Sequence, residues 1–236
     1  MGVYAGGRLH RNQTGGGAGM IFADVAQMRI HEGDVQRITA NGVVLWEAPS
    51  ADGLPAGYTA CEYIQFSGKQ QFDTGVFPTQ KTKIELTFTR ESSNALYMYG
   101  VRNSGNTASV TAYLSSSGAW RFGNTYRNYT LSQNAKHTAI VDSTGINMDG
   151  TKSSYGLSVK AFTANATLTF GATRGTGGAL GTPQFIGKLY TLKMYDDSEL
   201  IRDYMPCINP QGVYGFWENV QREFVTSATD TAFTGG

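Results

Sequence analysis

Aromatic and arginine side chains recur at polar positions between residues 97 and 129, and these residue types are suited to holding a sugar. A sugar presents apolar C–H faces and a rim of hydroxyl groups, so an aromatic plane beside a forked guanidinium donor matches its surface. The run Tyr126-Arg127-Asn128-Tyr129 is predicted to lie in a loop, where packing does not require two tyrosines. The predicted ligand-binding residues are Tyr99, Arg102, Tyr126, Arg127 and Tyr129.

The same stretch also has a purely structural interpretation. Tyrosine and tryptophan are ordinary strand residues that form cross-strand pairs, so part of this set could serve packing alone. Trp120 alternates with Phe122 and is predicted to face the core. Both interpretations stay open for the wider set, which adds Tyr97, Tyr113 and Arg121.

No catalytic residues are predicted from the chain's titratable groups. Three scattered histidines justify no Ser-His-Asp arrangement, and His137 is predicted to be a surface residue. The two cysteines and three histidines show no zinc-ligand spacing, so we predict no metal and no cofactor. A Cys61–Cys207 disulfide is an alternative if the segments that carry these two cysteines pair with each other. Free thiols are favoured, because a reducing compartment keeps cysteines reduced.

The chain's charge and hydropathy argue against two classes of partner, nucleic acids and membranes. The chain has 19 Lys and Arg against 18 Asp and Glu, a net charge of +1, so it lacks the clustered cations of a nucleic-acid-binding protein. Its longest apolar runs are far shorter than the roughly 20 residues that span a bilayer, and no signal peptide is evident. We therefore predict synthesis in a cytoplasm, with no nucleic-acid partner and no membrane association.

From Tyr58 onward, apolar and polar residues alternate with turns about every ten residues, which is the pattern of an antiparallel sandwich. Ile84, Leu86 and Phe88 illustrate it, because polar residues separate them. Residues 55–236 are therefore predicted to form one all-β domain of two antiparallel sheets, without long helices.

The first 54 residues divide into three predicted segments. Residues 1–22 are rich in glycine and read as a flexible arm. In residues 23–48, Asn41-Gly42 separates two alternating runs, which is a strong hairpin signal. A lone hairpin is marginal in water, so this element is predicted to attach to a larger assembly or to form a trimer. A simple cap on the sandwich is the alternative, and residues 49–54 form a linker.

Two segments far apart in the sequence read as one sheet edge: Leu54–Gly75 (LPAGYTACEYIQFSGKQQFDTG) and Gly187–Gly236. The second begins with a predicted hairpin that turns at Asp196-Asp197-Ser198. Together with GKLYTLKMYDDSELIRDYMPCINPQGVYGFW, the first segment resembles the concanavalin A-like (laminin G-like) jelly-roll domains of phage tail and fibre proteins.

That resemblance implies a concanavalin A-like jelly-roll sandwich in a phage virion protein, made in the bacterial host. It also implies that residues 1–48 contact other virion proteins and that the jelly roll binds host-surface or mucosal glycans. One alternative is a decoration protein that binds no ligand.

A glycan depolymerase is the other alternative, because this fold also occurs in glycoside hydrolases. Retaining hydrolases need two carboxyl groups about 5 to 5.5 Å apart. The β-glucanase pattern E-x-D-x-x-E is absent, and Asp196, Asp197 and Glu199 read as turn residues. Similar domains bind calcium, but the loop acids here form no D-x-[DN]-x-[DN]-G run, so calcium is not assigned.

Overall fold

The computed structural model describes residues 53–115, 118–175, 179–182 and 184–236, and the backbone of four short strands before them. By its contacts the chain forms two compact units, Met1–Ala48 and Pro49–Gly236. In the described residues every regular element is a β-strand.

The first unit contains two antiparallel ladders. β3 (Arg37–Ala40) pairs with β4 (Val43–Glu47) on either side of Asn41-Gly42, which is the predicted hairpin. β1 (Gly2–Ala5) pairs with β2 (Arg8–Arg11), so the predicted glycine-rich arm contains a ladder that its composition did not indicate. The other residues of the predicted arm, hairpin and linker, up to residue 52, lie outside the described residues.

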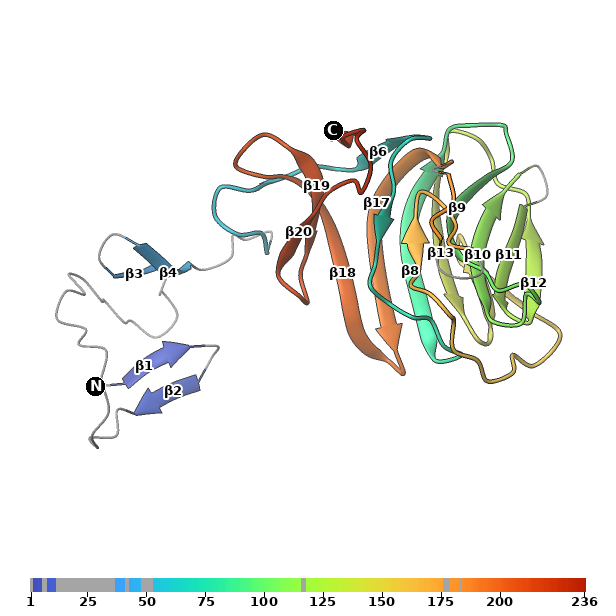
Figure 1. Ribbon diagram of the computed structural model, residues 1–236, viewed down its shortest axis with the longest axis horizontal. Helices are drawn as coiled ribbons and strands as arrows, with labels where there is room; N and C mark the ends of the chain where they lie inside the picture. Colours follow the sequence, from blue (N-terminus) through green and yellow to red (C-terminus); the bar gives the residue numbers. More distant parts are fainter. Residues whose placement is uncertain are drawn as a thin grey trace. The chain divides into compact units, whose positions relative to one another are not determined.

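The second unit is a sandwich of two antiparallel sheets, which confirms the predicted jelly-roll fold class (Figure 1). The smaller sheet has the order β12 (Thr125–Tyr129), β11 (Gly118–Gly123), β10 (Ser109–Leu114), β9 (Leu96–Val101), β16 (Thr169–Phe170), β7 (Phe72–Asp73). We call it the six-stranded sheet.

The larger sheet has the order β15 (Thr151–Ser154), β14 (Gly145–Met148), β13 (Lys136–Asp142), β8 (Thr82–Arg90), β17 (Ile186–Asp196), β18 (Glu199–Ile208), β19 (Tyr214–Glu218), β20 (Glu223–Val225). Three short strands join it beside this path: β5 (Thr59–Ala60), β6 (Ile64–Ser67) and β21 (Thr234–Gly235).

Aromatic side chains fill the space between the sheets. Phe72 stacks on Phe170 at 5.5 Å, and Trp120 contacts both Phe88 and Tyr99 with ring centroids 5.9 Å apart. Each fully buried phenylalanine stabilises the fold by roughly 1.5–3 kcal/mol relative to an exposed one. Trp120 is completely buried, as predicted.

The two terminal segments of the sandwich meet as predicted, but inside the larger sheet and not at its edge. β6 pairs with β17, β5 pairs with β18, and β21 pairs with β6, so the C-terminus lies beside β6 (Figure 1). The edges of the larger sheet's main path are β15 and β20. The hairpin β17–β18 turns at Asp197 and Ser198, which have φ of 48° and 75°, as a tight two-residue connection requires.

The two cysteines are free thiols, although the segments that carry them pair. Cys207 lies opposite Ala60, and the N–H of Cys61 donates to the carbonyl of Pro206 at 3.1 Å. Burial raises the pKa of the Cys61 thiol to about 11 and that of Cys207 to about 12.

The prediction that His137 is a surface residue is wrong. Its ring is buried against Phe88, and Nδ1 lies 2.7 Å from Oδ2 of Asp149. Nε2 lies 3.0 Å from the carbonyl O of Ser132 and 3.3 Å from its Oγ. A catalytic histidine would use Nε2 to accept the serine proton, whereas here a carbonyl faces the same nitrogen. The arrangement therefore fixes the loop before β13 to the turn after β14.

The protonation of Asp149 is coupled to this contact. Burial raises its pKa, but hydrogen bonds from His137 and from the backbone of Thr138 outweigh burial, so the pKa lies below its ordinary value of 3.8. A lowered pKa means that the ionised form stabilises the fold above the unfolded pKa of about 4, and that this is lost as the pH falls through the folded pKa.

We expect Asp149→Asn to lower the free energy of unfolding at about pH 6 by roughly 1 kcal/mol, because the carboxylate is partly exposed. The melting temperature should fall by roughly 2–4 °C for a domain of this size. At a second, lower pH the thermal melts of variant and wild type should differ less, because Asp149 loses its charge as the pH falls through its lowered folded-state pKa. The exposed Asp230→Asn is the control. An equal deficit at both pH values would contradict the ionic contribution of Asp149.

Candidate functional site

One row of residues crosses the whole outer face of the six-stranded sheet. The strand register places each residue opposite the next, and the row reads Tyr126, Arg121, Thr111, Gly100, Thr169, Asp73. Three sequence segments that are distant along the chain therefore contribute to one surface.

Alternation decides which side chains of β10 and β11 reach this face. Ala112, Trp120 and Phe122 are completely buried between the sheets. Because neighbours along a strand point to opposite faces, Tyr113 and Arg121 must point outward. Tyr126 lies opposite Arg121 and shares its face.

A β-bulge changes the alternation in β9. Tyr99 lies opposite Ala112, while Tyr97 lies opposite Tyr113, so one residue of β10 is matched by two of β9 at this point. Met98 and Tyr99 are both completely buried. The bulge thus turns Tyr97 outward and Tyr99 inward, although simple alternation predicts that they share a face.

Two tyrosine–arginine pairs occupy the outer face. Arg102 donates from Nη1 to the hydroxyl of Tyr97 at 2.9 Å. The guanidinium of Arg121 lies over the ring of Tyr126, 5.1 Å from its centroid. The ring of Tyr97 also packs against Tyr113, with centroids 4.7 Å apart. Each guanidinium is therefore held by an aromatic side chain, an attraction of about 0.5–1 kcal/mol at exposed sites.

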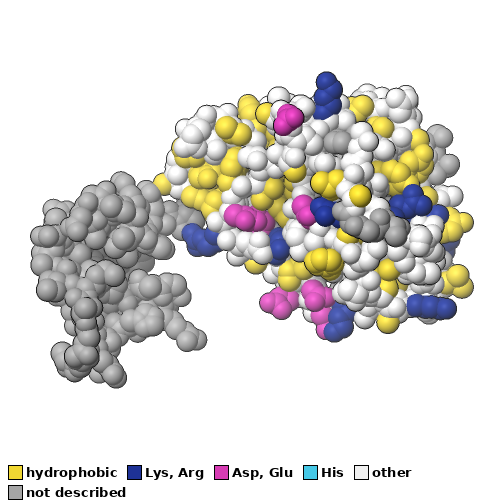
Figure 2. Space-filling view, in the orientation of Figure 1, with side chains coloured by type: hydrophobic (Ala, Val, Ile, Leu, Met, Phe, Trp, Pro, Cys, Tyr) yellow, Lys and Arg dark blue, Asp and Glu magenta, His cyan; other side chains and the backbone are white. Residues whose placement is uncertain are grey.

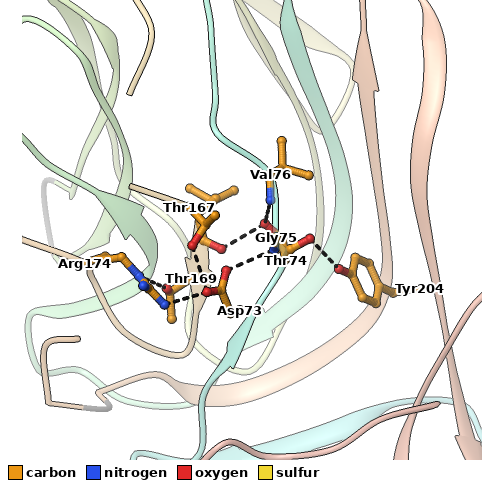
Figure 3. A network of polar contacts seen from close by, with 9 residues as sticks. Asp73, Thr74, Gly75, Val76, Thr167, Thr169, Arg174 and Tyr204 are labelled. Carbon is orange, nitrogen blue, oxygen red and sulfur yellow. Dashed lines mark hydrogen bonds and ion pairs between the residues drawn. The ribbon is translucent and has the colours of Figure 1, made fainter. Parts of the chain in front are cut away.

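An ion pair occupies the other end of the row (Figure 3). Arg174 Nη2 lies 2.6 Å from Oδ2 of Asp73, and the hydroxyl of Thr167 donates to the same oxygen at 2.8 Å. Arg174 also donates from Nε to Thr169 at 3.3 Å, and the N–H of Gly75 donates to Oδ1 of Asp73 at 3.0 Å. In Figure 3 the side chains of Thr167 and Arg174, which lie before and after β16, point toward Asp73.

Gly100 allows a loop to reach the middle of the row. A Cβ at this position would lie 2.7 Å from Cγ2 of Thr173, closer than real Cβ atoms approach a neighbour. With no side chain there, the backbone N–H of Arg174 donates to the carbonyl of Gly100 at 2.9 Å. The loop therefore separates the tyrosine–arginine half of the face from the Asp73 half.

The structure brings two of the five predicted ligand residues onto this face and places three elsewhere. Arg102 and Tyr126 belong to it, and the side chain of Tyr126 is 53% exposed. Tyr99 lies in the core, where it cannot stack on a sugar.

Arg127 and Tyr129 also serve packing. Arg127 donates from Nε to the carbonyl of Ser154, and Tyr129 donates to the carbonyl of Ile146 at 3.1 Å. These bonds join the edge strand β12 to β14 and β15 of the larger sheet. The run 126–129 is thus part of a strand and not a loop, and its alternate residues have different neighbours.

Sequence reasoning left Tyr97, Tyr113 and Arg121 undecided between packing and binding, and it did not single out Asp73. One signal in the sequence could have helped. From Ser92 through Val141 the chain contains no aspartate or glutamate, although it contains Arg102, Arg121 and Arg127. A long segment that contains arginines and no acids indicates arginines without an acidic partner nearby in the sequence.

On the face of the sandwich drawn in Figure 2, charges of both signs are dispersed among uncharged side chains. Within the described ranges, no group of three or more His, Cys, Asp or Glu side chains could hold a metal ion. The same ranges contain no helix long and apolar enough to cross a membrane.

No protein-family model matches this chain, and no curated protein matches it. Among solved structures, it is similar to the native heptameric SAP-like pentraxin from Limulus polyphemus. The sequence identity is 11% and the TM-score is 0.38, over 61% of this chain and 76% of that chain.

The inward position of Tyr99 leads to a prediction. Its hydroxyl has no hydrogen-bond partner among the described residues, so Tyr99→Phe should leave the melting temperature unchanged or raise it. Tyr129→Phe is the matched comparison, because it removes a bonded hydroxyl and should cost about 1 kcal/mol. Thermal melts of the two variants and the wild type test this prediction. A loss of several degrees in Tyr99→Phe would mean that this hydroxyl is satisfied in the core.

Proposed function

We propose that the sandwich is the glycan-binding module of a phage virion protein, and that the outer face of the six-stranded sheet holds the glycan. The two tyrosine–arginine pairs carry this proposal. Their rings offer apolar planes for sugar C–H faces, and their guanidinium groups offer donors for hydroxyl and carboxylate oxygens.

The virion location has a separate basis. It rests on the resemblance of residues 54–75 and 187–217 to jelly-roll domains of phage tail and fibre proteins. In this proposal, residues 1–48 attach the module to other virion proteins or to further copies of the chain, as a trimer, and the sandwich is displayed outward.

The two alternative functions, a decoration protein and a depolymerase, would require different residues on the outer face of the six-stranded sheet. A decoration protein without a ligand needs no paired aromatic and cationic groups there, so Tyr97–Arg102 and Tyr126–Arg121 favour binding. A depolymerase needs two carboxyl groups flanking the scissile bond. Asp73 is the one carboxylate within the strands of the six-stranded sheet, and it is bonded to Arg174.

The proposal is tested by screening the full chain on a glycan array and then titrating the strongest glycan. Tyr113→Ala and Tyr126→Ala should each weaken binding by roughly five- to thirtyfold, which corresponds to about 1–2 kcal/mol for a lost stacking contact. Both side chains are at least partly exposed, so melting temperatures should change little.

Tyr195→Ala is the matched control. Tyr195 lies on β17 of the larger sheet, where it contacts Lys83 and donates to Glu85 at 3.1 Å. Its removal should leave glycan binding unchanged. If Tyr195→Ala weakens binding while the other two variants bind normally, the ligand lies on the larger sheet. If no glycan is bound at all, the decoration protein becomes the better account.

A further inference from the structure

Arg102 and Arg121, in the tyrosine–arginine half of the outer face, have no carboxylate partner among the described residues, and this suggests the chemical class of the ligand. Resting on the glycan-binding function proposed above, we propose that the ligand is an acidic glycan whose carboxylates are bound by Arg102 and Arg121. Neither arginine forms an ion pair with any described aspartate or glutamate.

The lack of acids extends around the two arginines. The strands β9, β10, β11 and β12 and the loops that join them fall within the acid-free segment from Ser92 through Val141. The nearest acid in the outward row is Asp73, which already binds Arg174. A surface with cations and no local anions attracts anionic ligands, and its field adds to any direct contact.

The donors of these arginines are only partly used. A guanidinium has five N–H groups, and the described side-chain hydrogen bonds of Arg102 use two of them, to Tyr97 and to Asn106. Arg121 is positioned by the ring of Tyr126, a contact that uses no N–H group. Donors therefore remain on both arginines for the two oxygens of a carboxylate, which arginine binds in a fork-to-fork geometry.

The same face shows how this protein holds a carboxylate. Asp73 receives a guanidinium at 2.6 Å and a threonine hydroxyl at 2.8 Å. The tyrosine–arginine half of the face has guanidinium and hydroxyl groups of the same kinds, but no acid of the six strands lies in that half. A ligand carboxylate would supply the missing partner.

Positioning by tyrosine also reduces the cost of binding. A free arginine side chain loses rotamer freedom when it binds, at about 0.5–1.5 kcal/mol per side chain. Arg102 and Arg121 are already restrained by Tyr97 and Tyr126. The face is thus prepared for an anionic group before the ligand arrives.

The experiment uses the full chain on an array of matched glycan pairs that differ by a carboxylate. Suitable pairs are 3′-sialyllactose with lactose, and oligogalacturonate with its methyl ester. We expect at least tenfold preference for the acidic member of the bound pair, and affinity that falls as NaCl rises from about 50 to 500 mM. Binding of neutral members equally or exclusively would overturn the acidic class while leaving glycan binding intact. Binding of no member would contradict the glycan-binding function itself.

Variants assign the effect to the two arginines. Arg102→Gln and Arg121→Gln should each weaken binding of the acidic glycan roughly tenfold or more and reduce its salt dependence. Arg121→Lys keeps the charge but loses the fork, so it should recover only part of the affinity. Arg222→Gln, at an exposed arginine on the turn before β20, is the control for net charge. If Arg222→Gln weakens binding as much as the other two, the preference reflects overall charge and not this site.

Discussion

The aromatic core between the two sheets determines which side chains reach the surface. Trp120, Phe122 and Tyr99 fill the space against Phe88, Phe170 and the rings around them. Their burial is worth several kcal/mol in total, far more than any contact on the outer face. Because a strand alternates between faces, burying these residues forces Tyr113 and Arg121 outward. The candidate site is therefore a consequence of core packing, and a change of register by one residue would exchange the two sets.

Much of the fold could be predicted from the sequence, because alternation and turn residues are local signals. The hairpin β17–β18, the alternation in β8 and the inward position of Trp120 follow from nearest neighbours along the chain. The errors arose where distant contacts decide. The bulge in β9 depends on its pairing with β10, and so the inward position of Tyr99 cannot be inferred from LYMYG alone. His137 is buried by Asp149 and Ser132, whose proximity is a property of the folded sandwich.

The two ends of the outer face differ in whether their charged side chains form ion pairs. Asp73 and Arg174 neutralise each other and are bonded to two threonines, so this end holds the loop after β16 against the sheet. Such a pair contributes little net stability once desolvation is counted, but it fixes one arrangement. Arg102 and Arg121, at the other end, contact aromatic side chains and form no ion pair with a described acid. The Asp73 half of the face is therefore neutralised by its own ion pair, whereas the tyrosine–arginine half carries positive charge without a described acidic partner. An anion is accordingly attracted to the tyrosine–arginine half.

Strand β12 combines contacts that close the sandwich with a contact on the outer face. An exposed sheet edge carries unpaired backbone groups and invites unwanted pairing. Arg127 and Tyr129 point inward and join this edge to the larger sheet through carbonyls of Ser154 and Ile146. Tyr126, on the opposite face of the same strand, supports Arg121. Fixing the edge therefore also fixes the tyrosine that positions the arginine. The candidate site thus shares its strand with the closure of the sandwich, and a site positioned in this way loses less entropy on binding than one built on a free loop.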